Sequence, residues 1–394
     1  MFKAPTLPQT LFCFLLSLAA LSAEAQAGED SSLNSSWKLD ASYEGYGSVV
    51  GSSINSSSAN PGNGVLQIPQ SQASVDSRPS FTLQNQDSIK LILQPRWQLG
   101  PSLTTYNDRP DERHFHSELS LTQGYAAVQL SEQWLFAAGV QNYQWGPAEL
   151  LTASNPMSHF SAGQRSILWV EKGHGLVRLN FSSGQNISAV VIGDLFDNNL
   201  TPANSGGTFS RLGLAKVEYQ VSPASYAGLS AGSGEHTQTW VGEYGSLGII
   251  DGLSIYGDAR QTIGSNAVYL VPRERSLETL ADLGIRFEDR VDARSEVIIN
   301  TYGYDRREFQ QLLSIASQSG LLSQGSSLPG LEFPGKTYLY ESVRLPEVGY
   351  QKRMTLNLRY IHSLMDQSGV VFFNGDQALT DHLNAVFEIS VSRG

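Results

Sequence analysis

Apolar and polar residues alternate with a period of two along most of this 394-residue chain. Between residues 279 and 287 every second residue is apolar or small, and the intervening positions carry charges such as Asp282 and Arg286. A period of two indicates β-strands. The inner strands of a soluble sandwich tolerate few charges, whereas a transmembrane barrel turns its polar face to a wet lumen and its apolar face to lipid. The pattern therefore predicts an all-β, antiparallel, up-and-down transmembrane β-barrel, with a secreted sandwich or propeller as the alternative.

Short and long connections between the alternating runs follow one another in turn. Short turns are expected at 131–133, 182–185, 222–224, 250–252 and 289–292, and long loops at 100–116, 146–173, 195–209, 264–277 and 305–350. Outer-membrane barrels have short periplasmic turns and long outer loops, and both chain ends normally lie in the periplasm. This parity predicts about sixteen strands, within a range of 14 to 18, and makes the weak run 80–84 a short strand.

The N-terminus has the form of a secretory signal peptide. An apolar stretch at 11–21 precedes Ala23, Glu24 and Ala25, which fit a cleavage site before Gln26. We therefore expect a signal peptide at 1–25, a polar leader at 26–36 and one barrel domain at 37–394; an uncleaved anchor is the alternative. The only cysteine, Cys13, lies in the signal, so the mature chain is expected to have no disulfide and no thiolate nucleophile.

Two local features modify the barrel pattern. Phe309, Leu312, Leu313 and Ala316 have the spacing i, i+3, i+4 and i+7, which predicts one short amphipathic helix in the loop 305–350. Its apolar side needs cover, so we expect this loop to fold inward and narrow the channel. Pro95 interrupts another alternating run and predicts a bulge or a weak point in the hydrogen-bond ladder.

No catalytic motif is found in the structural context that it requires. The sequence contains no His-Glu-x-x-His. Residues 228–232 match the letters Gly-x-Ser-x-Gly and residues 330–337 match those of a P-loop, but the first match lies inside an alternating run and the second inside the long loop 305–350. His114 and His116 share one face of an extended segment and could bind a metal, but exposed loop histidines are the alternative because no full ligand set accompanies them. The net charge of −11, with no basic stripe, excludes nucleic acid as a partner. We expect no enzymatic activity, no cofactor and no metal.

Charges of both signs fall on the predicted inner face of the barrel. The candidates for lining the lumen are Lys90, Arg96, Arg178, Lys216, Arg260, Arg286, Arg353, Arg359, Asp258, Asp282 and Glu296. Mixed signs suit a water-filled pore or a ladder of ion pairs that fills a closed barrel. A ring of one sign would imply an ion preference, and the sequence shows none.

The segment Gln144, Trp145, Gly146 and Pro147 is distinctive. Trp145, Gly146 and Pro147 resemble the Trp-Gly-Pro turn that follows a strand in the Wzi-like capsule-assembly family and in other porin-like outer-membrane barrels. The resemblance covers about residues 138 to 165 and implies binding or passage of surface polysaccharide without a cofactor. The alternative for this motif is an interfacial anchor that ends a strand. Parity places the loop after Trp145 on the outer face.

Together these features predict a protein of the Gram-negative outer membrane that reaches it by signal-dependent export. Its expected partners are outer-membrane lipid and lipopolysaccharide. The predicted function is a channel for small polar solutes. The alternative is a non-enzymatic barrel that binds or organises surface polysaccharide.

Overall fold

A computed structural model gives the conformation of most of the chain. It describes residues 12–18 (backbone only), 37–53, 63, 68–85, 88–106, 110–157, 173–184, 186–196, 211–235, 238–264, 277–301, 303–308, 310–311, 335–380 and 382–393. The polar leader 26–36 lies outside the described residues. No helix in the described part of the chain is long and apolar enough to cross a membrane.

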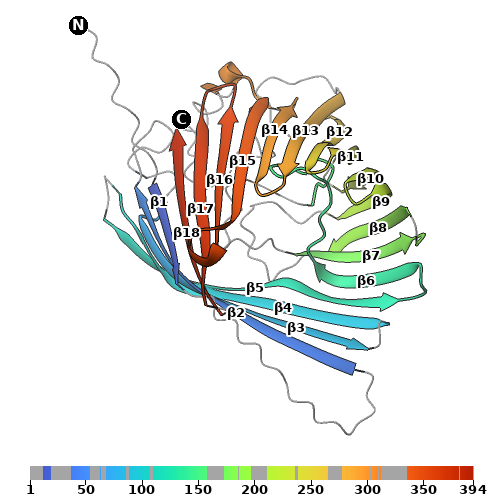
Figure 1. Ribbon diagram of the computed structural model, residues 1–394, viewed down its shortest axis with the longest axis horizontal. Coiled ribbons are helices and arrows are strands. Elements are labelled where there is room, and N and C mark those ends of the chain that lie inside the picture. The colour runs from blue at the N-terminus through green and yellow to red at the C-terminus, as the bar shows by residue number, and fades with distance from the viewer. Residues whose placement is uncertain are drawn as a thin grey trace.

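The described chain forms one antiparallel sheet that closes on itself (Figure 1). Each strand from β2 to β18 pairs with the strands before and after it in sequence, and β1 pairs with both β18 and β2. The first nine strands are β1 (Phe12–Leu18), β2 (Trp37–Ser53), β3 (Ser71–Asn85), β4 (Ile89–Thr104), β5 (Glu112–Gln129), β6 (Trp134–Gln141), β7 (His174–Ser182), β8 (Ile187–Phe196) and β9 (Leu212–Ser222). The second nine are β10 (Ser225–Gly234), β11 (Trp240–Ile250), β12 (Leu253–Ile263), β13 (Leu277–Glu288), β14 (Asp292–Asn300), β15 (Thr337–Val348), β16 (Met354–Ser363), β17 (Gly369–Thr380) and β18 (Leu383–Arg393). The predicted up-and-down barrel is confirmed, and the strand number falls within the predicted range.

The outer wall of this barrel is apolar and its inner wall is polar. Leu93 and Trp97 of β4 are 49% and 52% exposed on the outside, whereas Asp282 and Glu296 of β13 and β14 are fully buried on the inside. Because lipid replaces water around a transmembrane barrel, an exposed apolar band is the stable outer surface. Most strands from β6 onward are close to the roughly 9–11 residues that span a bilayer, but β2 to β5 are longer, at 15 to 18 residues.

The strand β15 corrects the expectation that 305–350 is one long loop. Its inner face carries Tyr338, Tyr340 and Ser342, while Glu341 lies on the opposite face beside Ser295. The barrel pattern assigns charged residues to the inner face and aromatic residues to the outer face. In β15 the aromatic residues face inward and a charged residue faces outward, so the sequence pattern did not predict a strand. Because of this extra strand, β18 runs from the short-turn end to the long-connection end, away from the end where β2 begins. We expected the start of the first barrel strand and the end of the last one to lie on the same side of the membrane, and for β2 and β18 this expectation is wrong.

Other predicted loops are also shorter than expected. β4 and β5 extend into the region 100–116, and β3 begins at Ser71, well before the short strand predicted at 80–84. The predicted helix in 305–350 begins at Arg306, where Asp305 accepts hydrogen bonds from the backbone N–H groups of Arg307 and Glu308. The Glu308 carboxylate in turn accepts the N–H of Asp305, which completes a capping box. Residues 309 and 312–334 lie outside the described residues, and with them most of the apolar face of this helix.

Pro95 lies at a bulge, as predicted. The register between β4 and β5 shifts at Gln94 and Pro95, and the hydroxyl of Thr122 donates to the carbonyl oxygen of Gln94 over 2.8 Å. On the other side of β4 the pairing with β3 is interrupted between Ser77 and Phe81. Because proline has no N–H to donate, it is tolerated where the ladder is already broken.

Candidate functional site in the lumen

The segment 142–157, named here the lumen loop, leaves β6 and folds into the barrel. Its residues Leu150 and Leu151 are buried against Ile298 and Tyr340 on the inner face of β14 and β15. Polar barrel interiors do not bury leucines unless another segment covers them. The hydrophobic core on this side of the protein therefore lies inside the barrel, and the expectation that the loop after Trp145 sits on the outer face is wrong.

A second apolar cluster holds the two ends of the lumen loop. Trp145 is 6% exposed and Met157 is 3% exposed, and both belong to a cluster with Ile192 of β8 and Trp240 of β11. Trp145 is thus buried inside the barrel, where it cannot act as an anchor in the membrane interface. Together the two clusters seat the lumen loop across the inner wall from β7 to β15.

A buried carboxylate of the wall clamps the first turn of the lumen loop. Glu296 Oε1 accepts the backbone N–H of Glu149 over 2.6 Å, and Oε2 accepts that of Leu150 over 2.8 Å. The hydroxyl of Tyr256 donates to Oε1 over 2.6 Å. A buried charge is stable only when such donors replace its hydration. The clamp therefore satisfies the carboxylate and the loop backbone at the same time.

The second clamp is formed by Asp258 of β12. Its Oδ1 accepts the backbone N–H of Ser154, while the hydroxyl of Ser230 donates to the carbonyl oxygen of Ser154 over 3.2 Å. Asp258 stands directly opposite Asp282 in the register of β12 and β13, and both are buried. Two ionised carboxylates directly opposite each other would destabilise a sheet. The loop N–H group at Asp258 offsets part of that cost, which couples the folding of the loop to the wall.

A carboxylate of the lumen loop also accepts hydrogen bonds from the wall. Glu149 accepts the hydroxyls of Tyr340 over 3.0 Å and Ser342 over 3.1 Å. The guanidinium Nε of Arg294 lies 3.1 Å from Glu149 Oε2. The loop is thus held from both directions, by wall carboxylates on its backbone and by wall donors on its side chain.

Cations and aromatic rings meet where the lumen loop begins. Arg178 of β7 lies 4.6 Å from the ring centroid of Tyr143, and Lys216 of β9 lies 5.3 Å from that of Tyr244. Glu218 accepts Lys216 over 3.2 Å and the hydroxyl of Tyr244 over 2.8 Å. Burial raises the pKa of Tyr143, so this phenol stays neutral. The base of the loop is held by charge-assisted and cation–π contacts.

The predicted lumen residues are distributed unequally. Asp258, Asp282 and Glu296 come together on three successive strands, and Arg178 and Lys216 lie at the base of the lumen loop. Four others lie elsewhere in the interior. Arg96 pairs with Asp76 at 2.7 Å, and Arg286 pairs with Asp292 at 2.8 Å. Arg359 is 1% exposed and lies beside Phe372, and Arg260 is partly buried on β12. Lys90 and Arg353 are exposed at the short-turn end, and Arg353 precedes β16, so it is not part of the strand wall.

Sequence reasoning missed Glu149, Arg294, Tyr256 and Tyr340. The pairing of Glu149 with Tyr340 joins positions 191 residues apart, which no local pattern reports. One signal was available: Leu150 and Leu151 interrupt an otherwise polar loop, and adjacent leucines need cover.

The two histidines singled out in the sequence are exposed on β5 beside carboxylates. His114 Nε2 lies 3.1 Å from Glu112, and His116 Nε2 lies 3.1 Å from Glu118. Within the described ranges, no group of three or more His, Cys, Asp or Glu side chains is arranged to hold a metal ion.

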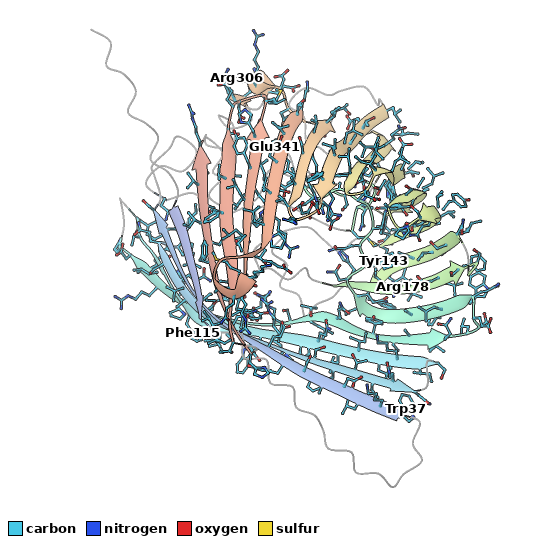
Figure 2. The ribbon with its side chains drawn as sticks, in the orientation of Figure 1. Trp37, Phe115, Tyr143, Arg178, Arg306 and Glu341 are labelled. Carbon is cyan, nitrogen blue, oxygen red and sulfur yellow. The ribbon has the colours of Figure 1, made fainter. Side chains whose placement is uncertain are left out.

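The fold and the lumen define a transmembrane up-and-down β-barrel with an internal loop (Figure 2). No protein-family model matches the sequence, and no curated protein matches it. The resemblance to the Wzi-like family therefore rests on the residues named above. Three similar solved structures are OccAB1 of Acinetobacter baumannii (8% identity, 97% of this chain and 95% of that chain, TM-score 0.48), OccK5 of Pseudomonas aeruginosa (11%, 99% and 99%, 0.43) and a porin of Rhodopseudomonas blastica (6%, 98% and 99%, 0.42).

Proposed function

We propose that this protein is a channel that lets small polar solutes cross the outer membrane, and that the lumen loop narrows its passage. The observation that carries the proposal is the clamped loop on the inner wall of the barrel. A loop whose backbone is bound by Glu296 and Asp258 is a fixed part of the lumen. A fixed constriction selects solutes by size and polarity without any catalytic group.

The lumen loop leaves part of the inner wall uncovered by its own contacts. Its two apolar clusters use β7, β8, β9, β11, β13, β14 and β15. On the far side, the inner face of β3 and β4 carries Asp76, which pairs with Arg78 at 2.6 Å and Arg96 at 2.7 Å. This group of one carboxylate and two guanidinium groups offers hydrogen bonds to a hydrated solute. Solute passage along this wall is part of the proposal.

The proposed location is supported by the apolar outer band and by the signal peptide predicted at the N-terminus. We propose export directed by residues 1–25, with outer-membrane lipid and lipopolysaccharide around the band. Removal of 1–25 takes away β1 and leaves β2 and β18, which run in the same direction, on either side of the seam. The mass of the protein extracted from outer membranes tests the cleavage, because a mature chain should begin at Gln26.

Reconstitution in planar lipid bilayers tests the channel directly. The purified full-length product should give discrete, stepwise ionic conductance, and neutral polymers above a size limit should fail to enter. Circular dichroism of the same sample verifies that the barrel is folded. Folded protein that inserts into bilayers and stays silent would contradict the proposed function.

A further inference from the structure

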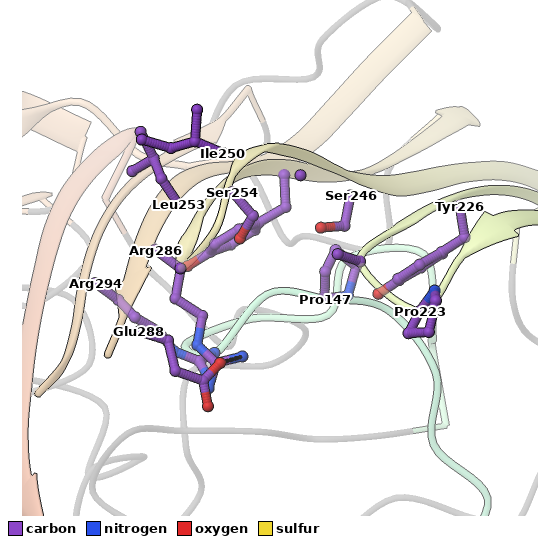
Figure 3. A pocket seen from close by; sticks show the side chains of 14 residues that line it. Pro147, Pro223, Tyr226, Ser246, Ile250, Leu253, Ser254, Arg286, Glu288 and Arg294 are labelled. Atoms are coloured by element: carbon purple, nitrogen blue, oxygen red, sulfur yellow. Dashed lines mark ion pairs between the residues drawn. The ribbon is translucent and has the colours of Figure 1, made fainter. Parts of the chain in front are cut away.

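A cavity lies between the lumen loop and the wall near the short turns (Figure 3). Its volume is about 410 Å³, within the roughly 300–1,000 Å³ of small-molecule sites. Pro147 of the lumen loop lines it, as do Pro223 and Gly252 from two of the short turns. The cavity therefore sits at the end of the lumen that short turns surround, with the loop as one wall.

The charges that line this cavity are already compensated. Arg286 contacts Glu288 at 2.8 Å and makes two bonds to Asp292, at 2.8 Å and 2.9 Å. Arg294 contacts Glu149 at 3.1 Å and Asp292 at 3.4 Å. Three carboxylates thus share two guanidinium groups. An anionic solute would find no uncompensated positive charge here and would lose its hydration without a counter-charge.

Hydroxyl groups supply the remaining polarity. Tyr226, Ser246 and Ser254 line the cavity, and none of these hydroxyls has a hydrogen-bond partner within the described part of the chain. In Figure 3 Tyr226 and Pro147 lie on one side of the cavity and the Arg286, Glu288 and Arg294 group on the other. A hydroxyl both donates and accepts, so three such groups match a solute that is itself rich in hydroxyls. The tyrosine ring and the prolines offer apolar surface to the C–H groups of such a solute.

We propose that this cavity binds a small neutral sugar, in preference to a carboxylate of the same size. The inference rests on the proposed channel function, because the cavity is reached through the lumen. It names the substrate class: neutral polyhydroxylated solutes. Binding here places the sugar against the lumen loop and reduces the ionic current while it is bound.

The test uses two probes of nearly equal size, namely glucose and gluconate. Each is titrated into bilayers that carry the full-length protein, and the saturable fall in potassium chloride conductance is measured. Glucose should act at a concentration about tenfold or more below that of gluconate, which corresponds to 1.4 kcal/mol of preference. Equal or stronger action of gluconate, or no saturable effect of glucose, overturns the sugar site.

A variant locates the effect in the cavity. Tyr226→Phe combined with Ser246→Ala and Ser254→Ala removes the three hydroxyls and should raise the half-effect concentration of glucose about tenfold or more. Ser48→Ala, on the inner face of β2 across the barrel, is the control and should leave the response unchanged. Conductance without a glucose response contradicts only the sugar site, whereas a silent folded barrel contradicts the channel itself. The comparison of the two probes on the unsubstituted protein decides the matter even if the variant does not fold.

Discussion

Gly146 is the residue that lets the lumen loop approach its clamp. Its φ is +96°, a conformation that side chains other than glycine rarely adopt, and a Cβ placed there would lie 2.1 Å from Asp258 Oδ2. The structure gives each residue of the Trp-Gly-Pro motif a role. Trp145 packs in an apolar cluster, Gly146 permits the turn beside Asp258, and Pro147 lines the cavity. The motif fixes the path of the loop.

Gly146→Ala should therefore destabilise the protein more than an ordinary glycine substitution. Gly184 provides a matched control, because its φ is also positive, at +75°, but a Cβ there would meet nothing within 4 Å. Gly184→Ala should lower the free energy of unfolding by roughly 1–2 kcal/mol from backbone strain alone. Gly146→Ala should lower it further, because a collision with a buried carboxylate adds to the strain. Urea unfolding in lipid vesicles, followed by tryptophan fluorescence, measures both; equal losses would show that Asp258 does not crowd Gly146.

At the scale of elements, the lumen loop is held more by buried polar contacts than by its own secondary structure. Glu296 accepts hydrogen bonds from three groups, two of them backbone N–H groups of the loop. A glutamine side chain would present an amide N–H₂ to one of these donors. Because hydrogen bonds to a charged acceptor contribute about 1.5–3 kcal/mol each, their loss should release the loop from the wall.

Glu296→Gln should accordingly make the lumen loop accessible to protease. Chymotrypsin should cut after Leu150 or Leu151 about tenfold or more faster than in the unsubstituted protein, since 1.4 kcal/mol of lost docking is a tenfold change in the open fraction. Glu288→Gln is the control, because the side chain of Glu288 is exposed and contacts Arg286 of the wall, away from the backbone of the lumen loop. Mass spectrometry of the fragments gives the cleavage rates. Identical rates in the two variants would remove Glu296 from its role as a clamp.

Prediction from the sequence succeeded where a wall strand meets lipid on one side and water on the other. Runs such as 279–287 and 383–391 satisfy that condition, and both are strands. β15 lacked the signal because Tyr338 and Tyr340 face inward to cover the leucines of the lumen loop. Where the inner wall packs against a loop, its residues are aromatic, so a prediction that expects polar residues on the inner face fails. The unpredicted strand β15 and the wrong placement of the loop after Trp145 thus have one physical cause.

At the scale of the whole molecule, the inner wall divides into two kinds of surface. From β7 to β15 it is a packed interface with the lumen loop, whereas β3 and β4 carry the paired charges of Asp76, Arg78 and Arg96. The sequence indicated that Asp258, Asp282 and Glu296 face inward but gave no reason for three carboxylates on neighbouring strands. For Asp258 and Glu296 the reason is the backbone of a loop more than 100 residues earlier in the chain, at separations of 104 and 147 residues. Such pairings depend on barrel closure and cannot be read from local spacing.

The most direct test of this account is the single-channel conductance of a barrel without its lumen loop. A Gly/Ser segment of the same length replaces residues 145–157, which removes Trp145, both leucines and the clamped backbone while leaving the strands intact. If the loop narrows the passage, this variant should conduct roughly twofold or more above the unsubstituted protein, because an inward segment no longer occupies the lumen. Folded variant barrels with unchanged conductance would contradict the claim that the lumen loop is the constriction.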